Sequence, residues 1–98
     1  DDHRLYLAIA QRALGEEHRV SGENAAAENY FKEALGLFTK LGARWQIGRT
    51  LYKLGELYFA QAKEKAREYY SQALRAFEEI RAAPDIERTR VVLDSLET

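Results

Sequence analysis

The side chains that could do acid–base or metal chemistry are few in this chain and lie far apart. His3 and His18 are the only histidines, 15 residues apart, and cysteine is absent. Protein zinc sites need three or four His, Cys or carboxylate ligands at short spacings, and no such cluster occurs. No glycine-rich phosphate-binding loop is recognisable either. We therefore expect no catalytic residue, no metal ion and no cofactor, and we expect the protein not to be an enzyme.

The arginine and aromatic side chains suit binding better than catalysis. Arg, Tyr and Trp dominate the energetics of protein interfaces, and the guanidinium group can bind a carboxylate through two parallel hydrogen bonds. The net charge of −1 over 98 residues gives no general attraction to nucleic acid or to an anionic membrane. No apolar run approaches the roughly 18 residues that span a bilayer. Together with the absence of cysteine, this favours a cytoplasmic protein.

A repeat of 39 to 40 residues organises the whole chain. The segment 30–38 returns as the segment 69–77, so that Tyr30 matches Tyr69 and Phe38 matches Phe77 at a spacing of 39. Farther upstream the spacing becomes 40, because Gly15 matches Gly55. Repeats of this length are typical of solenoids, in which each unit buries its apolar face on its neighbour. The repeat predicts units at about 3–41 and 43–81 and a half unit at 84–97, forming a single domain over 1–98.

Five stripes of apolar residues at three- and four-residue steps predict five helices, because this spacing places them on one helical face. The stripes begin with Leu7, Ala10 and Leu14 in the first helix, which we expect over 2–20, and continue through 27–41, 47–58, 66–80 and 86–96. Gly22 and Gly42 are expected to end helices, and a weaker turn is expected at 62–64. Short connections make neighbouring helices antiparallel. The prediction is an all-α fold of stacked antiparallel helix pairs.

The two full units resemble the tetratricopeptide repeat (TPR). That family's pattern is a large residue, Leu-Gly, an aromatic residue, and later an alanine four residues before an aromatic one. In the second unit these positions are Leu51, Leu54-Gly55, Tyr58, Ala66 and Tyr70. The first unit fills them with Gln11, Leu14-Gly15, His18, Ala27 and Phe31. The resemblance implies a right-handed α-solenoid of about two and a half repeats, in a 39–40-residue variant similar to repeat arrays of bacterial signalling ATPases and transcriptional activators.

In the family, the first helix of each pair lines a concave groove that binds a segment of a protein partner. Carried over by position, the resemblance assigns eleven residues to this groove: Ile9, Arg12, Glu16 and Arg19; Arg49, Tyr52, Glu56 and Phe59; Arg88, Val91 and Ser95. Some members of the family bind the acidic tails of chaperones with clamp asparagines. Those positions are Glu16 and Glu56 here, which argues against that binding mode. The alternative to a binding module is a structural spacer or oligomerisation segment of a multidomain regulator.

Two further expectations concern the ends of the chain. It begins with Asp1 and contains no methionine, so we expect it to be part of a larger protein. The expected last helix carries Val91, Val92, Leu93 and Leu96, and we expect Val92 or Leu96 to remain exposed. Exposed apolar patches usually mark interfaces, so self-association through the C-terminal helix, or continuation into a further helix, is predicted.

Overall fold

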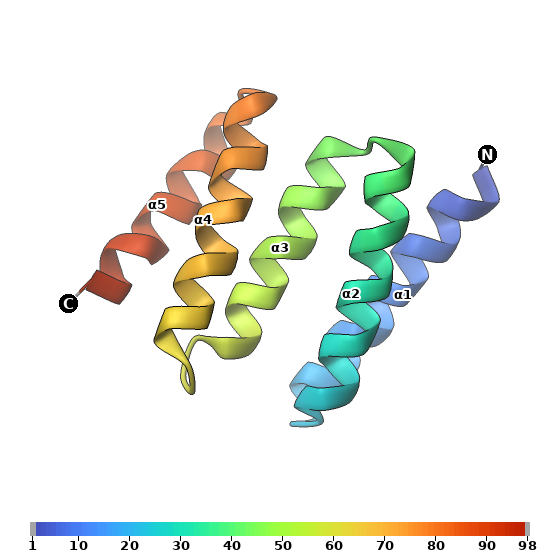
Figure 1. The fold of residues 1–98 in the computed structure, drawn as a ribbon, viewed down its shortest axis with the longest axis horizontal. Helices are drawn as coiled ribbons and strands as arrows, with labels where there is room; N and C mark the ends of the chain where they lie inside the picture. The colour runs from blue at the N-terminus through green and yellow to red at the C-terminus, as the bar shows by residue number, and fades with distance from the viewer. Residues whose placement is uncertain (1, 98) are drawn as a thin grey trace.

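The computed structural model describes residues 2–97, which form five α-helices and no strand. The helices are α1 (Asp2–Val20), α2 (Asn24–Leu41), α3 (Arg44–Tyr58), α4 (Lys63–Glu79) and α5 (Ala83–Glu97). Each helix packs on the next in the chain, most extensively α1 on α2 and α3 on α4. They lie side by side in chain order as an antiparallel array (Figure 1). The predicted all-α fold of five helices in sequential antiparallel pairs is confirmed.

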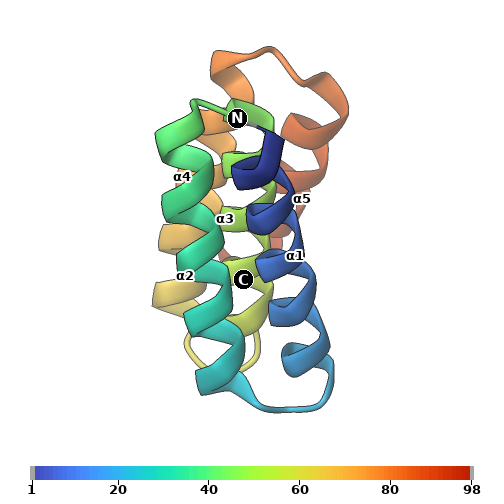
Figure 2. The same ribbon diagram turned by 90° about the vertical axis from the view of Figure 1, so that its right-hand side faces the viewer.

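The helices form a thin, two-sided layer. Its shortest dimension over the Cα atoms is 17 Å, against 42 and 33 Å for the other two. Seen from one end, α2 and α4 lie on one side, α1 and α5 on the other, and α3 between them (Figure 2). Side chains of α3 contact both α1 and α5: Lys53 lies 3.3 Å from Glu16 of α1, and Trp45 donates a hydrogen bond to Asp85 of α5. The first helices of the pairs, α1, α3 and α5, are thus connected on one face.

The glycine predicted to end α2 does so, whereas the turn between α3 and α4 lies at a different position from the one predicted. Gly42 ends α2 in the left-handed conformation, at φ 67°, and its N–H bonds the carbonyls of Phe38 and Thr39. Glycine adopts this conformation without the steric cost of a Cβ atom. The corner expected at 62–64 lies earlier, because α3 ends at Tyr58 and α4 already begins at Lys63. The acidic Glu64 thus lies in the first turn of α4, where the helix dipole favours a negative charge.

Small residues facing aromatic rings hold each pair together. A Cβ atom on Gly15 would lie 2.7 Å from ring atoms of Phe31, far closer than van der Waals contact. Only glycine lets α1 and α2 approach this closely. The predicted stripes on the second helices are confirmed in part. The equivalent sets Ala27, Phe31, Ala34, Phe38 and Ala66, Tyr70, Ala73, Phe77 are all buried. Of the other predicted members, Leu35, Leu41 and Leu74 are half-buried, and Ile80 is exposed because it lies one residue beyond the end of α4.

The stripe predicted on α1 is wrong. Leu7 and Leu14 are 49% and 40% exposed, and Ala10 is exposed as well. The helix instead buries Ala8 and Gly15 against α2. The physical reason is the place of α1 in the array: Leu54, the counterpart of Leu14 on α3, is fully buried against α2, whereas no described helix packs on the same face of α1.

The exposure predicted at the C-terminal helix is also wrong. Leu96 is only 3% exposed and packs with Ala66 and Tyr70 of α4, while Val92 is half-buried in the same cluster. The apolar side chain left in solvent is Val91, at 57% exposure. The helical phase of α5 turns residues 89, 92, 93 and 96 toward the preceding unit. Of the expected apolar patch, Leu96 is therefore buried, Val92 and Leu93 are half-buried, and Val91 points to solvent.

Candidate partner-binding groove

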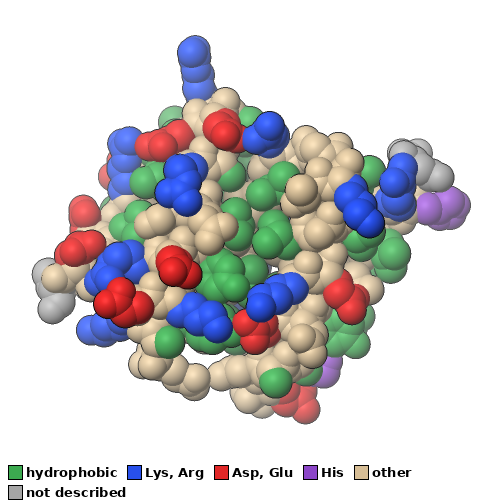
Figure 3. Space-filling view, in the orientation of Figure 1, with side chains coloured by type: hydrophobic (Ala, Val, Ile, Leu, Met, Phe, Trp, Pro, Cys, Tyr) green, Lys and Arg blue, Asp and Glu red, His purple; other side chains and the backbone are tan. Residues whose placement is uncertain are grey.

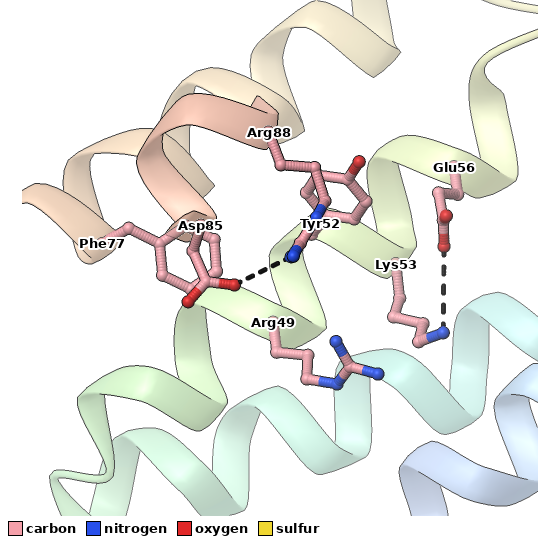
Figure 4. Close-up of a pocket in the computed structure, with 7 residues that line it drawn as sticks. All are labelled: Arg49, Tyr52, Lys53, Glu56, Phe77, Asp85 and Arg88. Carbon is pink, nitrogen blue, oxygen red and sulfur yellow. Dashed lines mark hydrogen bonds and ion pairs between the residues drawn. The ribbon is translucent and has the colours of Figure 1, made fainter. Parts of the chain in front are cut away.

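A pocket of about 300 Å³ lies on the shared face of α1, α3 and α5, between α3 and α5. Four of the eleven predicted groove residues line it: Arg49, Tyr52 and Glu56 from α3, and Arg88 from α5. Three-residue and four-residue steps bring the α3 side chains to one helical face. The remaining lining residues are Lys53, Phe77 and Asp85. The close-up shows the arrangement of all seven (Figure 4).

Ion pairs set the positions of the charged groups around this pocket. Arg88 donates to the carboxylate of Asp85 at 3.0 Å, one helical turn earlier on α5. The ammonium group of Lys53 lies 3.9 Å from Glu56 and 3.3 Å from Glu16 of α1. Lys53 therefore links α1 and α3, the first helices of the two units, on this face.

Trp45 joins α3 to α5 at the end of the pocket. Its indole N–H donates to Asp85 at 3.0 Å, and the guanidinium group of Arg49 lies 5.6 Å from the centre of its ring. The ring remains 40% exposed. A half-exposed aromatic ring beside an arginine is a surface that a partner side chain can cover.

Arg12 joins α1 to α3 on the same face. Its guanidinium group donates to the side-chain oxygen of Gln46 at 2.5 Å and lies over the ring of Phe38, 5.2 Å from its centre. Glu16, one turn farther along α1, accepts two hydrogen bonds from Arg19, at 2.6 and 3.1 Å.

The pKa values of Glu16, Arg12 and Tyr52 on this face are shifted for different reasons. The hydrogen bond from Arg19 is the main cause of a lowered pKa at Glu16, and the charge of Lys53 adds to it. Burial lowers the pKa of Arg12, and the nearby positive charge of Arg49 lowers it further. Burial raises the pKa of the Tyr52 hydroxyl.

The other predicted groove residues lie outside the pocket. Ile9 is half-buried against the core of the first pair, and Phe59 lies in the turn one residue beyond α3. Val91 and Ser95 are exposed on α5, where the Ser95 hydroxyl donates to the carbonyl of Val92. Arg12, Glu16 and Arg19 lie on α1. Arg12 bonds Gln46 and Glu16 pairs with Lys53, both on α3, whereas Arg19 pairs with Glu16 on its own helix.

Sequence reasoning missed Lys53, Phe77 and Asp85 in the pocket, as well as Gln46 beside it. Asp85 stands three residues before Arg88, a spacing that predicts an ion pair along one helical face. That signal was available in the sequence. Lys53 and Gln46 contact side chains of another helix. Phe77 lines the pocket from α4, although the apolar stripe predicts it to be a core residue. No local pattern reveals such contacts.

The histidines do not form a reactive cluster. The Nδ1 atom of His18 lies 2.7 Å from the carboxylate of Glu23, and its ring stacks on Tyr30 with a centroid distance of 5.2 Å. Among the described residues, no three His, Asp or Glu side chains are grouped as a metal site requires.

A tetratricopeptide repeat family model matches residues 6–79, three quarters of the chain. The chain belongs to the tetratricopeptide repeat family. TPR domains are protein–protein interaction modules, and no catalytic family was found. No curated protein and no solved structure matches the chain. Within the described part of this TPR domain, no helix is both long enough and apolar enough to cross a membrane.

Proposed function

We propose that this TPR domain binds a segment of a protein partner in the groove lined by α1, α3 and α5. The observation that carries the proposal is the pocket between α3 and α5, which is lined by Arg49, Tyr52, Arg88 and the ring of Phe77 together with three further charged residues. Arginine and aromatic side chains around a concave site are the composition of an interface core. The setting we propose is a multidomain regulator in the bacterial cytoplasm, by resemblance of the repeat sequences.

The opposite face is less suited to a specific partner. The space-filling view, with α2 and α4 in front, shows hydrophobic side chains in the middle of this face and basic and acidic side chains interspersed around them, without an area of one sign (Figure 3). Several of them pair with each other along or between these helices, as Glu28 does with Lys32 at 3.2 Å and Lys65 at 3.9 Å. Mixed, paired charges of this kind keep a surface solvated and contribute little binding energy. The same mixture argues against nucleic acid as the partner.

Selection of peptides from a random display library, followed by NMR mapping, tests this proposal. We expect selected peptides to shift backbone amide resonances of α1, α3 and α5. The double variant Arg49→Ala with Tyr52→Ala should bind them at least about tenfold more weakly. The matched control is Arg75→Ala with Tyr30→Phe, on the second helices. Shifts confined to α2 and α4, or equal affinity for the groove variant, would place the binding surface elsewhere.

One observation favours the alternative, a spacer or oligomerisation segment. The outer face of α1 exposes Leu7 and Leu14, and a second hollow of about 340 Å³ lies between Leu7 and Leu37 of α2. In the alignment of the two repeats, this face of α1 is equivalent to the face that α3 buries against α2. Sedimentation equilibrium of the protein and of the variants Leu7→Glu and Leu14→Glu tests whether copies of the chain associate through this face. Association that these changes abolish would favour the alternative, and a concentration-independent monomer would favour the groove.

A further inference from the structure

The charges in the groove do not balance. Five basic side chains face three carboxylates there: Arg12, Arg19, Arg49, Lys53 and Arg88 against Glu16, Glu56 and Asp85. Each carboxylate has a basic partner, because Arg19 and Lys53 bind Glu16, Lys53 also lies near Glu56, and Arg88 binds Asp85. Among the described residues, neither Arg12 nor Arg49 forms an ion pair with a carboxylate. The groove thus keeps two positive charges in a chain whose net charge is −1.

Arg12 is held in a position that is unfavourable for an uncompensated charge. It is half-buried over Phe38, and its hydrogen-bond partner Gln46 is a neutral amide. Desolvation of a charge costs free energy unless an opposite charge compensates it. Gln46, which accepts the hydrogen bond from Arg12, stands three residues before Arg49 on α3, so the two guanidinium groups belong to the same part of the groove. Burial lowers the pKa of Arg12, and the positive charge of Arg49 lowers it further.

Arg49 faces the groove without an acceptor of its own. Its contact is the ring of Trp45, at 5.6 Å. It extends away from the ion pair of Asp85 with Arg88, and no hydrogen bond joins it to the other residues around the pocket (Figure 4). The fork of N–H donors on a guanidinium group matches the two oxygens of a carboxylate. Two such groups from neighbouring units therefore present donors to the same part of the groove.

We propose that Arg12 and Arg49 together bind the carboxylate of an Asp or Glu side chain in the partner segment, an inference that rests on the proposed groove function. The bound carboxylate removes the repulsion between the two guanidinium groups and compensates the half-buried charge of Arg12. The neighbouring carboxylate Glu16 does not oppose it, because Arg19 and Lys53 already neutralise that group. A singly charged carboxylate suits the site better than a doubly charged phosphate, since three fixed carboxylates lie along the same groove.

A short synthetic peptide tests the site without knowledge of the natural partner. The probe is acetyl-Ala-Glu-Ala-Glu-Ala-amide, and its counterpart with Gln in place of both Glu residues is the isosteric control. We expect the Glu peptide to shift the side-chain Nε–H resonances of Arg12 and Arg49 and the indole N–H of Trp45 in a saturable way. The affinity should fall with added salt. Equal shifts with the Gln peptide, or tighter binding of inorganic phosphate at the same resonances, would overturn the inference.

Two double variants with the same change in net charge separate a local site from general attraction. Arg12→Gln with Arg49→Gln removes the proposed site, whereas Arg4→Gln with Arg75→Gln removes two exposed charges elsewhere. We expect the first variant to bind the Glu peptide about tenfold more weakly than the second, as is usual when a charged partner is lost. Equal weakening in both variants contradicts a specific site. Arg49→Gln alone serves as the test should the groove variant fail to fold.

Failure of the carboxylate site can be distinguished from failure of the proposed groove function. Peptides from the display library that map to α1, α3 and α5 but carry no acidic residue, and bind Arg12→Gln with Arg49→Gln unchanged, would refute the carboxylate site and leave the groove function standing. Peptides that map to other helices refute both proposals.

Discussion

The ring of Tyr70 occupies the space that any side chain on Gly55 would need. A Cβ atom built on Gly55 lies 2.8 Å from two ring carbons of Tyr70, where ordinary contacts begin at about 3.4 Å. The same relationship joins Gly15 to Phe31 in the first unit. Gly55 is therefore needed for the close packing of α3 on α4, although glycine lowers the intrinsic stability of the helix.

Replacing Gly55 should destabilise the protein although the new residue is a better helix former. Alanine gains roughly 0.8 kcal/mol of helix propensity over glycine, but the clash with Tyr70 costs about 1–3 kcal/mol. We expect a net loss for Gly55→Ala and a larger one for Gly55→Leu, measured as the free energy of unfolding in urea. The control is Gly36→Ala on α2, where a Cβ atom meets nothing within 4 Å, so stability should rise. A rise for Gly55→Ala would contradict the close approach.

Much of this packing could be predicted from the sequence, because it depends on local spacing that repeats. Gly15 and Phe31 recur as Gly55 and Tyr70, and both pairs pack alike. The exposure of single residues could not be predicted in the same way. Leu14 and Leu54 stand at equivalent positions, yet only Leu54 is buried, because burial depends on the neighbouring unit. The groove contacts of Gln46 and Lys53 cross between helices, and no pattern within one helix encodes them.

The stability of the seam between the two units should depend on pH through Glu28. Its pKa is lowered below the ordinary value of 4.5, mainly because the Tyr58 hydroxyl donates to it and also because Lys32 lies nearby. A lowered folded-state pKa means that this contribution is complete above about pH 4.5. It is lost as the pH falls through the lower folded-state value. We expect the free energy of unfolding to decrease below pH 4.5.

The variant Glu28→Gln isolates this contribution. It should lower stability at pH 7 by about 1 kcal/mol and flatten the decline of stability between pH 5 and 3, measured by urea unfolding across that range. Glu33→Gln, an exposed position on the same helix, is the matched control and should keep the decline of the unchanged protein. Parallel pH profiles for all three proteins would show that Glu28 is not responsible.

The C-terminal helix should depend on Leu96 and not on Val91. Leu96 is buried against Ala66 and Tyr70, and Arg67 binds its carbonyl oxygen at 3.2 Å. Truncation of a buried leucine costs about 2–5 kcal/mol, and a terminal helix that can fray should lie at the lower limit. We expect Leu96→Ala to lower the melting temperature and Val91→Ala to leave it nearly unchanged. Val91→Glu also tests self-association through this helix, because it changes the exposed surface and leaves the core intact. If the mass measured by light scattering still rises with protein concentration in this variant, any self-association occurs elsewhere.

Asp85 should hold the start of α5 against α3. Its carboxylate accepts hydrogen bonds from the indole of Trp45 and from Arg88, both at 3.0 Å, and it lies in the first turn of α5, where a negative charge is favourable. Asp85→Ala removes all three interactions, and we expect a loss of about 1–3 kcal/mol. Because Trp45 is the only tryptophan, its fluorescence should shift to longer wavelength as the indole loses this partner. Glu87→Ala removes an exposed carboxylate two residues farther along α5. It should change stability by less than about 0.5 kcal/mol and leave the emission unchanged. Equal effects of the two variants would mean that the charge alone matters and that the hydrogen bond from Trp45 does not order this end of the groove.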